Sequence, residues 1–286
     1  MENIKLELDE NFREEMFFIN IPENIQNDEK QETQDEDIPK IIFIVPYRDR
    51  EQHLSFFNRH MEYILEDYQE TDKKIMIIHQ NDKRSFNCGA MKNIGFRIVK
   101  ELYPNNYKDI TLVFNDVDTL PFTKNFIDYN TKPNIIKHFY GFKHTLGGIV
   151  SVNGGDFEKI NGYPNFWAWG YEDNMFYERA IRSKIEINRE QFYPYADKNI
   201  LHFYDGYVKQ VNKKEFDRYA NATQEGIYSI YNLEYTYEED TNMYHVNKFD
   251  TQQKEDVTAI KEHDLHKGTK PFHHNKGRGA VMSMLI

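Results

Sequence analysis

Two carboxylates one residue apart are the feature of this 286-residue chain that says most about chemistry. Asp116 and Asp118 follow an apolar run at residues 110–114, which predicts a buried strand. In an extended chain both side chains project to the same side of the strand end. Like charges this close repel each other unless a cation lies between them or one takes up a proton. Carboxylate oxygens suit Mn²⁺ or Mg²⁺, which bind diphosphates, so the pair indicates a metal–nucleotide site. A solvated turn is the alternative for the pair taken alone.

The elements around this pair predict an α/β fold. Apolar runs at residues 40–45, 74–79 and 110–114 have the composition of strands, and residues 52–65 and 90–102 between them have helical periodicity. This alternation predicts a mostly parallel sheet with crossover helices. The acidic pair then lies at the carboxyl end of the third strand, where ligands bind in open α/β sheets.

Basic and glycine residues follow two of the predicted strands. Arg48 and Arg50 come after a strand that breaks at Pro46, and guanidinium groups suit phosphate oxygens. Pairing of the arginines with neighbouring acids is an equally good interpretation. Gly147 and Gly148 precede another predicted strand, where the absence of a side chain allows a ligand or a second backbone segment to come close.

A cluster of indoles and acids has the composition of a sugar site. Trp167 and Trp169 lie just before Glu172 and Asp173, at the start of a predicted helix. Indole faces stack on sugar rings, and carboxylates accept hydroxyl protons. Alternatively, the tryptophans belong to the core and the acids favour a helix N-terminus. His202 could complete a metal site with Asp118, although a single histidine beside aromatic residues is more often structural.

Together these segments resemble the β-1,4-galactosyltransferase family. The resemblance covers about residues 38–235 and rests on six motifs in the family's order, namely FIVPYRDREQHL at 43–54, FNCGAMKNIGF at 86–96, FNDVDTLP at 114–121, GGIVSV at 147–152, INGYP at 160–164 and WAWGYEDN at 167–174.

This resemblance implies a GT-A fold, which is a Rossmann-like mixed α/β sheet flanked by helices. We expect an acidic flexible leader at residues 1–38, a single catalytic domain at 39–250 and a C-terminal tail at 251–286. The implied activity is inverting, metal-dependent transfer of a hexose or N-acetylhexosamine (Gal, GalNAc or GlcNAc). The sugar would pass from a UDP-sugar donor to a hydroxyl group of a glycan or glycoconjugate acceptor. The implied cofactor is Mn²⁺, with Mg²⁺ as the alternative. A binding module that has lost catalysis and a UDP-sugar hydrolase are the competing functions.

The resemblance also implies roles for the matched positions. The catalytic carboxylates would be Asp173, as general base, and Glu172 beside it. The metal ligands would be Asp118, His202 and Asn199. The donor and nucleotide would contact Pro46, Arg48, Arg50, Phe86, Asp116, Thr145, Gly147 and Gly148. The acceptor sugar would contact Trp169, Gly170 and Tyr171.

Four departures from the family pattern have predicted consequences. Cys88 stands where the family has an arginine, so one UDP contact is missing, for which Arg84 could substitute. Asn199 stands at the position of a methionine ligand, and its harder oxygen favours Mg²⁺. Tyr171 replaces a glycine and should reshape the acceptor pocket. Thr145 replaces a tyrosine near the 2-position of the donor sugar and leaves room for an N-acetyl group.

Composition excludes some classes of protein. The net charge of −11 argues against general nucleic-acid binding, and much of the acidic excess lies in residues 1–38. The longest wholly apolar run, residues 41–45, is far below the roughly 18 residues of a membrane span. No signal peptide is visible, and the single cysteine excludes an intrachain disulfide. We therefore expect a soluble protein without a membrane span, in the cytoplasm or associated with a virus.

Overall fold

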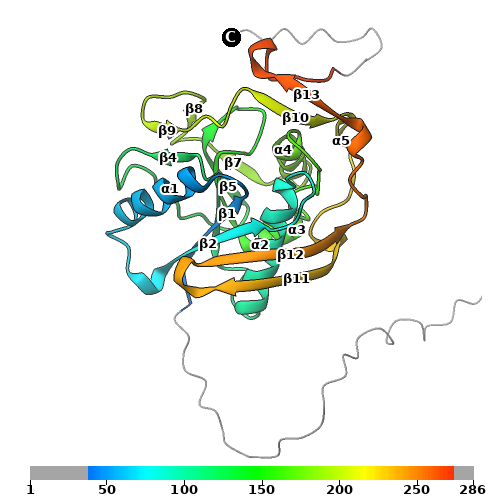
Figure 1. Ribbon diagram of the computed structural model, residues 1–286. Helices are drawn as coiled ribbons and strands as arrows, with labels where there is room; N and C mark the ends of the chain where they lie inside the picture. Colours follow the sequence, from blue (N-terminus) through cyan, green and yellow to red (C-terminus); the bar gives the residue numbers. More distant parts are fainter. Residues whose placement is uncertain (1–37, 274–286) are drawn as a thin grey trace, which may run out of the picture. The chain divides into compact units, whose positions relative to one another are not determined.

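The computed structural model describes residues 38–273, and its centre is a nine-stranded mixed sheet (Figure 1). The strands of the described chain are β1 Ile41–Tyr47, β2 Lys73–Gln80, β3 Thr111–Asn115, β4 Thr119–Pro121, β5 Ile135–Gly141, β6 Ile149–Asn153, β7 Glu186–Asn188, β8 Tyr193–Pro194, β9 Ile200–His202, β10 Val208–Asn212, β11 Ile230–Glu238, β12 Met243–Thr251 and β13 Ile260–Asp264. The α-helices are α1 Glu51–Ile64, α2 Cys88–Leu102, α3 Gly154–Lys159, α4 Glu172–Arg182 and α5 Lys213–Ala220.

The order of strands in the central sheet is β11-β12-β2-β1-β3-β6-β5-β7, with β8 paired to β5. Strands β12, β2, β1 and β3 are parallel neighbours, as the alternation of strands and helices predicts for the first three along the chain. Strand β6 then runs antiparallel to β3 and to β5. The sheet is therefore mixed, which is the arrangement expected of a GT-A fold.

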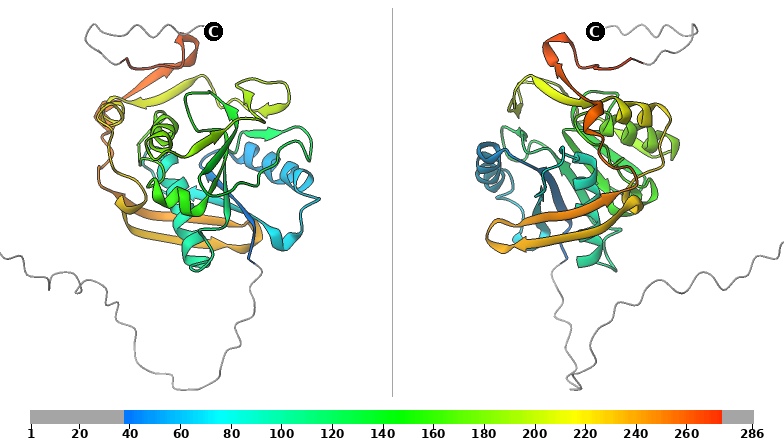
Figure 2. Two further views of the ribbon diagram at one scale, coloured as in Figure 1. Left: turned by 180° about the vertical axis from the view of Figure 1, so that it is seen from behind. Right: turned by 45° about the vertical axis from the view of Figure 1, so that its right-hand side comes forward.

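Strand β1 lies in the middle of the sheet, and its side chains contribute to the hydrophobic cores on both faces. Ile42 and Ile44 point into a core that includes α2, whereas Ile41, Phe43 and Val45 point into a second core under α1. Helix α1 buries Leu54, Phe57, Met61 and Ile64, at the helical spacing visible in the sequence. The views of Figures 1 and 2 show α1 and α2 on opposite sides of the sheet.

Helix α2 packs unusually close to the sheet at a glycine. A Cβ atom added to Gly95 would lie 2.5 Å from a side-chain carbon of Ile44, so only glycine fits at this contact. The helix begins after Asn87, whose side-chain oxygen accepts a hydrogen bond from the backbone N–H of Ala90 at 2.9 Å. The motif at residues 86–96 thus fixes where α2 starts and how it docks on β1.

Two small sheets complete the region above the carboxyl ends of the central strands. Strand β4 pairs antiparallel with β9, and β10 pairs antiparallel with β13. In Figure 1, β10 and β13 lie together at the end of the molecule opposite the hairpin of β11 and β12. Strand β13 comes from the segment after residue 250, so part of that segment belongs to a sheet.

No helix within residues 38–273 is long and apolar enough to cross a bilayer. The acidic leader expected at residues 1–38 lies almost entirely outside the described part of the chain.

Candidate active site

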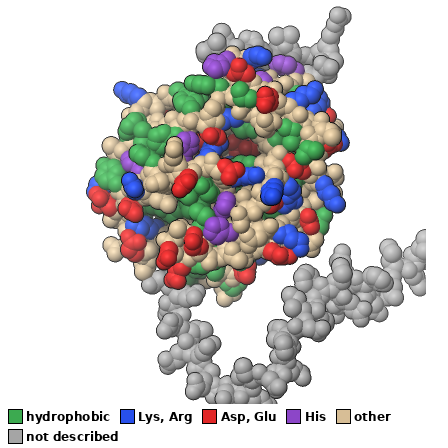
Figure 3. All heavy atoms as spheres, viewed as in Figure 1, with side chains coloured by type: hydrophobic (Ala, Val, Ile, Leu, Met, Phe, Trp, Pro, Cys, Tyr) green, Lys and Arg blue, Asp and Glu red, His purple; other side chains and the backbone are tan. Residues whose placement is uncertain are grey.

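A cavity of about 500 Å³ opens where the ends of β1 and β3, the β9–β10 connection and the start of α4 meet. Figure 3 shows acidic side chains deep in a hollow of the face that it presents. Twelve of the predicted site residues line the cavity, namely Pro46, Arg50, Phe86, Asp116, Asp118, Thr145, Gly147, Gly148, Trp169, Glu172, Asp173 and His202. Segments far apart in sequence therefore converge on one site.

The acidic pair lies in a turn between β3 and β4. Strand β3 ends at Asn115, so the pair follows the end of the strand as predicted, but the chain turns there instead of staying extended. The chain turns because Asn115 is buried and its side-chain amide donates hydrogen bonds to the carbonyls of Asp116 and Thr119, at 2.9 and 2.8 Å. Gly148 also stabilises the turn, since its N–H donates a hydrogen bond to Asp116 Oδ2 at 3.2 Å. Both carboxylates nevertheless face the cavity.

Asp118 and His202 lie on neighbouring strand ends. Thr119 is opposite His202 in the β4–β9 pairing, and the N–H of Phe203 donates to the carbonyl of Asp118 at 2.9 Å. Within the described part of the chain, the buried Nδ1 atom of His202 has no hydrogen-bond partner. Burial lowers the pKa of His202. Burial raises the pKa of Asp118, and the nearby charge of Asp116 raises it further. A neutral imidazole with an unpaired nitrogen beside a carboxylate suits a divalent cation.

The protein supplies only part of a coordination shell. Within residues 38–273, no group of three or more His, Cys, Asp or Glu side chains could hold a metal ion. A cation at Asp118 and His202 would take its remaining ligands from a bound diphosphate, as Mg²⁺ and Mn²⁺ do when few carboxylates are present. Asn199 does not line the cavity, and its side-chain amide donates to Asp197 Oδ1 at 3.0 Å. This placement gives no support to Asn199 as a metal ligand.

Of the two predicted arginines, Arg50 lines the cavity and Arg48 does not. Arg50 donates to Asp118 at 2.8 Å and forms an ion pair with Asp205 at 3.0 Å. Arg48 does not line the cavity and instead pairs with Asp49 at 3.0 Å and with the backbone carbonyl of Arg84. Only one of the two predicted arginines thus faces the site, and the other makes the neighbouring ion pair that the sequence left open.

Arg84 is held elsewhere by aromatic packing. Its guanidinium lies 4.6 Å from the ring of Trp167 and 4.3 Å from that of Phe249, and it donates to the Phe249 carbonyl at 2.8 Å. Trp167 is buried and stacks on Phe249. These contacts give Arg84 a structural role and do not support its use as a substitute phosphate ligand.

Trp169 is the tryptophan that faces the cavity. It lies in a loop where Ala168, Gly170 and Tyr171 have positive φ angles of 72°, 111° and 73°. Backbone hydrogen bonds hold this loop, from the N–H of Ala168 to Phe86 at 3.1 Å and from the N–H of Trp169 to the carbonyl of Gln210 at 2.8 Å. Non-glycine residues rarely adopt such angles, and they persist where surrounding contacts enforce them, often at functional sites.

Tyr171 turns away from the cavity. Its ring packs against Phe216 and Tyr219 of α5, with centroids 5.0 and 5.2 Å away, and its hydroxyl donates to the Phe272 carbonyl at 3.4 Å. Neither Tyr171 nor Gly170 lines the cavity. Tyr171 therefore holds the segment around Phe272. Its position gives no support to the prediction that it shapes the acceptor pocket directly.

Asp173 sits on the cavity floor at the first turn of α4. A Cβ atom added to Gly147 would lie 2.0 Å from Asp173 Oδ2, so this glycine is required for the carboxylate to occupy its place. Burial raises the pKa values of Asp173 and Glu172, and the mutual proximity of the acids adds to the rise for Glu172. A buried carboxylate with a raised pKa has the basicity of a general base near neutral pH.

Several residues at the site were not predicted from the sequence, among them Lys92, Leu265 and Thr269. Lys92 of α2 lies beneath the cavity, 3.1 Å from Asp173 and 3.6 Å from Asp116. Leu265 and Thr269, from the segment after β13, line the outer wall. The available signal for Lys92 was its place inside the motif at residues 86–96, and α2 puts it on the same face as Cys88, four residues earlier.

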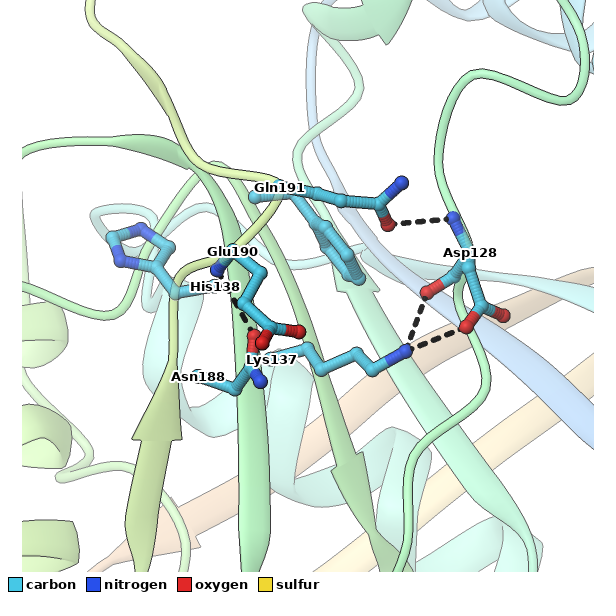
Figure 4. A pocket seen from close by; sticks show the side chains of 7 residues that line it. Asp128, Lys137, His138, Asn188, Glu190 and Gln191 are labelled. Atoms are coloured by element: carbon cyan, nitrogen blue, oxygen red, sulfur yellow. Dashed lines mark hydrogen bonds and ion pairs between the residues drawn. The ribbon is translucent and has the colours of Figure 1, made fainter.

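A second hollow of about 280 Å³ lies along β5 and contains none of the predicted site residues (Figure 4). Some of its polar groups pair with one another, since Lys137 contacts Asp128 at 2.7 Å and the N–H of Asp128 donates to Gln191 at 3.1 Å. The larger cavity is therefore the candidate active site.

Family models match most of the chain. The N-terminal region of glycosyl transferase group 7 matches residues 8–130, and a model described as the N-terminal domain of galactosyltransferase matches residues 134–205. The chain is 34% identical to xylosylprotein 4-beta-galactosyltransferase of Caenorhabditis elegans over 160 residues, which are 52% of this chain and 53% of the relative. It is 29% identical to bovine beta-1,4-galactosyltransferase 1 over 198 residues, which are 65% of this chain and 47% of the relative. The chain thus spans about half the length of these relatives.

Solved structures share the fold. The catalytic domain of Drosophila beta1,4galactosyltransferase 7, in complex with xylobiose, superposes with a TM-score of 0.62 at 21% identity, over 80% of this chain and 97% of that domain. A mutant of the fly enzyme in complex with manganese, UDP-Gal and xylobiose gives a TM-score of 0.59 at 22% identity and the same coverage. The fold is therefore GT-A, and with the two family models in consecutive order, the chain belongs to the β-1,4-galactosyltransferase family.

Proposed function

We propose that the protein is an inverting, metal-dependent glycosyltransferase that uses a UDP-sugar donor. The convergence of Asp118, His202 and Asp173 on one cavity carries this proposal. The three residues come from separate segments. Asp118 and Asp173 lie in motifs of the family to which the chain belongs, and the resemblance gives His202 the role of a metal ligand. Sugar transfer needs a cation site for the diphosphate and a base for the acceptor, and the cavity offers residues suited to each.

Five residues of the cavity suit the donor: Pro46, Arg50, Phe86, Asp118 and His202. Asp118 and His202 would hold Mn²⁺, or Mg²⁺, which when bound offsets the negative charge of the departing diphosphate. Arg50 lies 2.8 Å from Asp118 and adds a positive charge beside it. Pro46 and Phe86 offer apolar surface on the cavity wall, which suits the uracil ring. Mn²⁺ and UDP-Gal are both present in the complex of the related fly enzyme.

Other residues of the cavity suit the acceptor. Asp173 would remove the proton of the acceptor hydroxyl as its oxygen attacks the anomeric carbon from the face opposite UDP. The bond from that carbon to the UDP oxygen breaks in the same step, so an α-linked donor yields a β-linked product. Trp169, which is 38% exposed and lines the cavity, offers an apolar face for a sugar ring.

A donor screen tests the proposal. UDP release is measured from UDP-Gal, UDP-GalNAc, UDP-GlcNAc and UDP-Glc with Mn²⁺, with Mg²⁺ and with EDTA. We expect release from at least one donor, dependent on metal and stimulated by acceptor glycosides. The acceptor panel includes β-xylosides, because a relative is named for xylosylprotein and the fly enzyme is bound to xylobiose. Release that no glycoside stimulates would identify a hydrolase, and no metal-dependent release from any donor would contradict the proposal.

A further inference from the structure

Lys92 is a buried cation between two carboxylates of the site. Its side chain is 1% exposed, and its Nζ atom lies 3.1 Å from Asp173 Oδ1 and 3.6 Å from Asp116 Oδ1. The ammonium also lies 4.5 Å from the centre of the Tyr163 ring. Burial of a lysine is costly unless the charge is paired, so the two carboxylates are what keep this ammonium in place.

Lys92 acts from behind the cavity wall. Asp116, Asp173 and Cys88 line the cavity, whereas Lys92, one helical turn beyond Cys88, does not. A bound substrate would therefore contact the carboxylates and not the lysine. Any effect of Lys92 on chemistry must pass through the charge and orientation of these carboxylates.

The balance of charge around Asp116 and Asp173 depends on Lys92. The acids Asp116, Glu172 and Asp173 lie together there, and Arg50 is committed to Asp118 and Asp205. Within residues 38–273, no other lysine or arginine forms an ion pair with Asp116 or Asp173. Removal of the ammonium would leave like charges unopposed, and one carboxyl group would then take up a proton near neutral pH.

Lys92 also fixes the direction of the Asp173 carboxylate. Oδ1 accepts a hydrogen bond from Lys92 at 3.1 Å, while Oδ2 rests against Gly147, where no Cβ could fit. One oxygen is held by charge and the other by close packing. The carboxylate plane is therefore set before any acceptor arrives, which removes an ordering cost from the reaction.

We infer that Lys92 is a positioning residue for sugar transfer, a buried counter-ion that holds Asp173 ionised and oriented as the base. The inference rests on the proposed function of Asp173. Lysine is suited to this place because its single ammonium reaches both Asp116 and Asp173 from one buried stem.

The test compares Lys92→Met with a control on the same helix, Lys100→Met, which removes an ion pair of 2.6 Å to Glu158 outside the cavity. Initial rates of transfer with saturating UDP-sugar and Mn²⁺ are measured from pH 5 to 9. We expect the acid limb of the Lys92→Met profile to move up by about 1 to 3 pH units, the range by which an opposite charge shifts a carboxyl pKa. Affinity for UDP with Mn²⁺ should stay within about threefold of wild type, and Lys100→Met should leave the acid limb in place.

A purely structural role predicts another pattern. The folded Lys92→Met protein would then have a lower melting temperature but an unmoved acid limb, and this result would overturn the inference. If that variant does not fold, wild-type protein labelled with ¹³C at lysine Cε provides the second measurement. The Lys92 signal, identified by its loss in Lys92→Arg, should shift with the same midpoint as the acid limb of activity. A Lys92 signal that does not respond over that range would also overturn the inference. A wild-type protein without any transfer activity would instead count against the proposed function.

Discussion

At the residue scale, the sequence identifies acids and a histidine more reliably than it identifies their supporting residues. All four predicted residues of this kind line the cavity, namely Asp116, Asp118, Asp173 and His202. They could be predicted because they lie at strand ends or at the start of a helix. Lys92 escaped notice because a lysine on a helix is usually a solvated residue. Only the packing of α2 under the cavity makes it a buried partner, and no local pattern encodes that.

Asp173→Asn separates chemistry from binding. The amide keeps the shape of the side chain but cannot accept a proton, so we expect turnover to fall by at least about 100-fold. UDP affinity in the presence of Mn²⁺, measured by calorimetry, should change little because Asp118, His202 and Arg50 are unchanged. Normal turnover in a correctly folded Asp173→Asn protein would rule out its role as base.

The pH dependence of turnover follows from the burial of the base. Burial raises the pKa of Asp173 to about 6, despite the opposing effect of Lys92. The carboxylate is the active form, so activity should be full above this pKa and fall as the pH drops through it. Rates at saturating substrate from pH 4 to 9 test this. An acid limb near pH 4, the value of an exposed aspartate, would contradict the assignment.

Thr145 bears on the choice of donor. Its side chain lines the cavity beside Gly147, and its hydroxyl donates to the Phe142 carbonyl at 3.1 Å. Thr145→Tyr should fill the space available to an N-acetyl group and lower the rate with UDP-GalNAc relative to UDP-Gal by about tenfold or more. Thr145→Ser is the matched control. An unchanged ratio of donor hydrolysis rates in the tyrosine variant would exclude this pocket as the discriminator.

At the element scale, the first half of the chain was predictable and the second half was less so. The succession of β1, α1, β2, α2 and β3 follows from apolar runs and helical periodicity, and the parallel pairings confirm it. The parallel contact of β12 with β2 joins residues about 170 positions apart, and local periodicity cannot specify such a pairing. Strand β13 has the sequence IKEHD, without an apolar alternation that would mark a strand.

The segment that follows β13 should affect the acceptor more than the donor. Thr269 lines the outer wall of the cavity, and the segment is tied to the Trp169 loop through β10 and Tyr171. Thr269→Trp should raise the KM for acceptor glycosides while acceptor-free donor hydrolysis stays near wild type. Lys261→Trp, on an exposed position of β13, is the control. Equal losses of hydrolysis and transfer in Thr269→Trp would mean that this wall does not distinguish the two substrates.

At the scale of the whole molecule, the mixed sheet explains why distant residues meet. Parallel strands β1 and β3 end at the same edge, and the antiparallel strand β6 begins there with its glycine pair. The strand pair β4–β9 then brings His202 to the acidic turn. Sequence motifs indicated the residues of the site, and the resemblance to a known family implied a mixed sheet, whereas the order of the strands is seen only in the structure.

The most direct test of the account is the affinity of the whole chain for UDP, measured by calorimetry with Mn²⁺ and with EDTA. Because a cation held by Asp118 and His202 would join the diphosphate to the protein, EDTA should weaken UDP binding by at least about tenfold. His202→Ala should weaken binding in Mn²⁺ to a similar degree, whereas His144→Ala, outside the cavity lining, should not. Equal UDP affinity with Mn²⁺ and with EDTA would contradict the account.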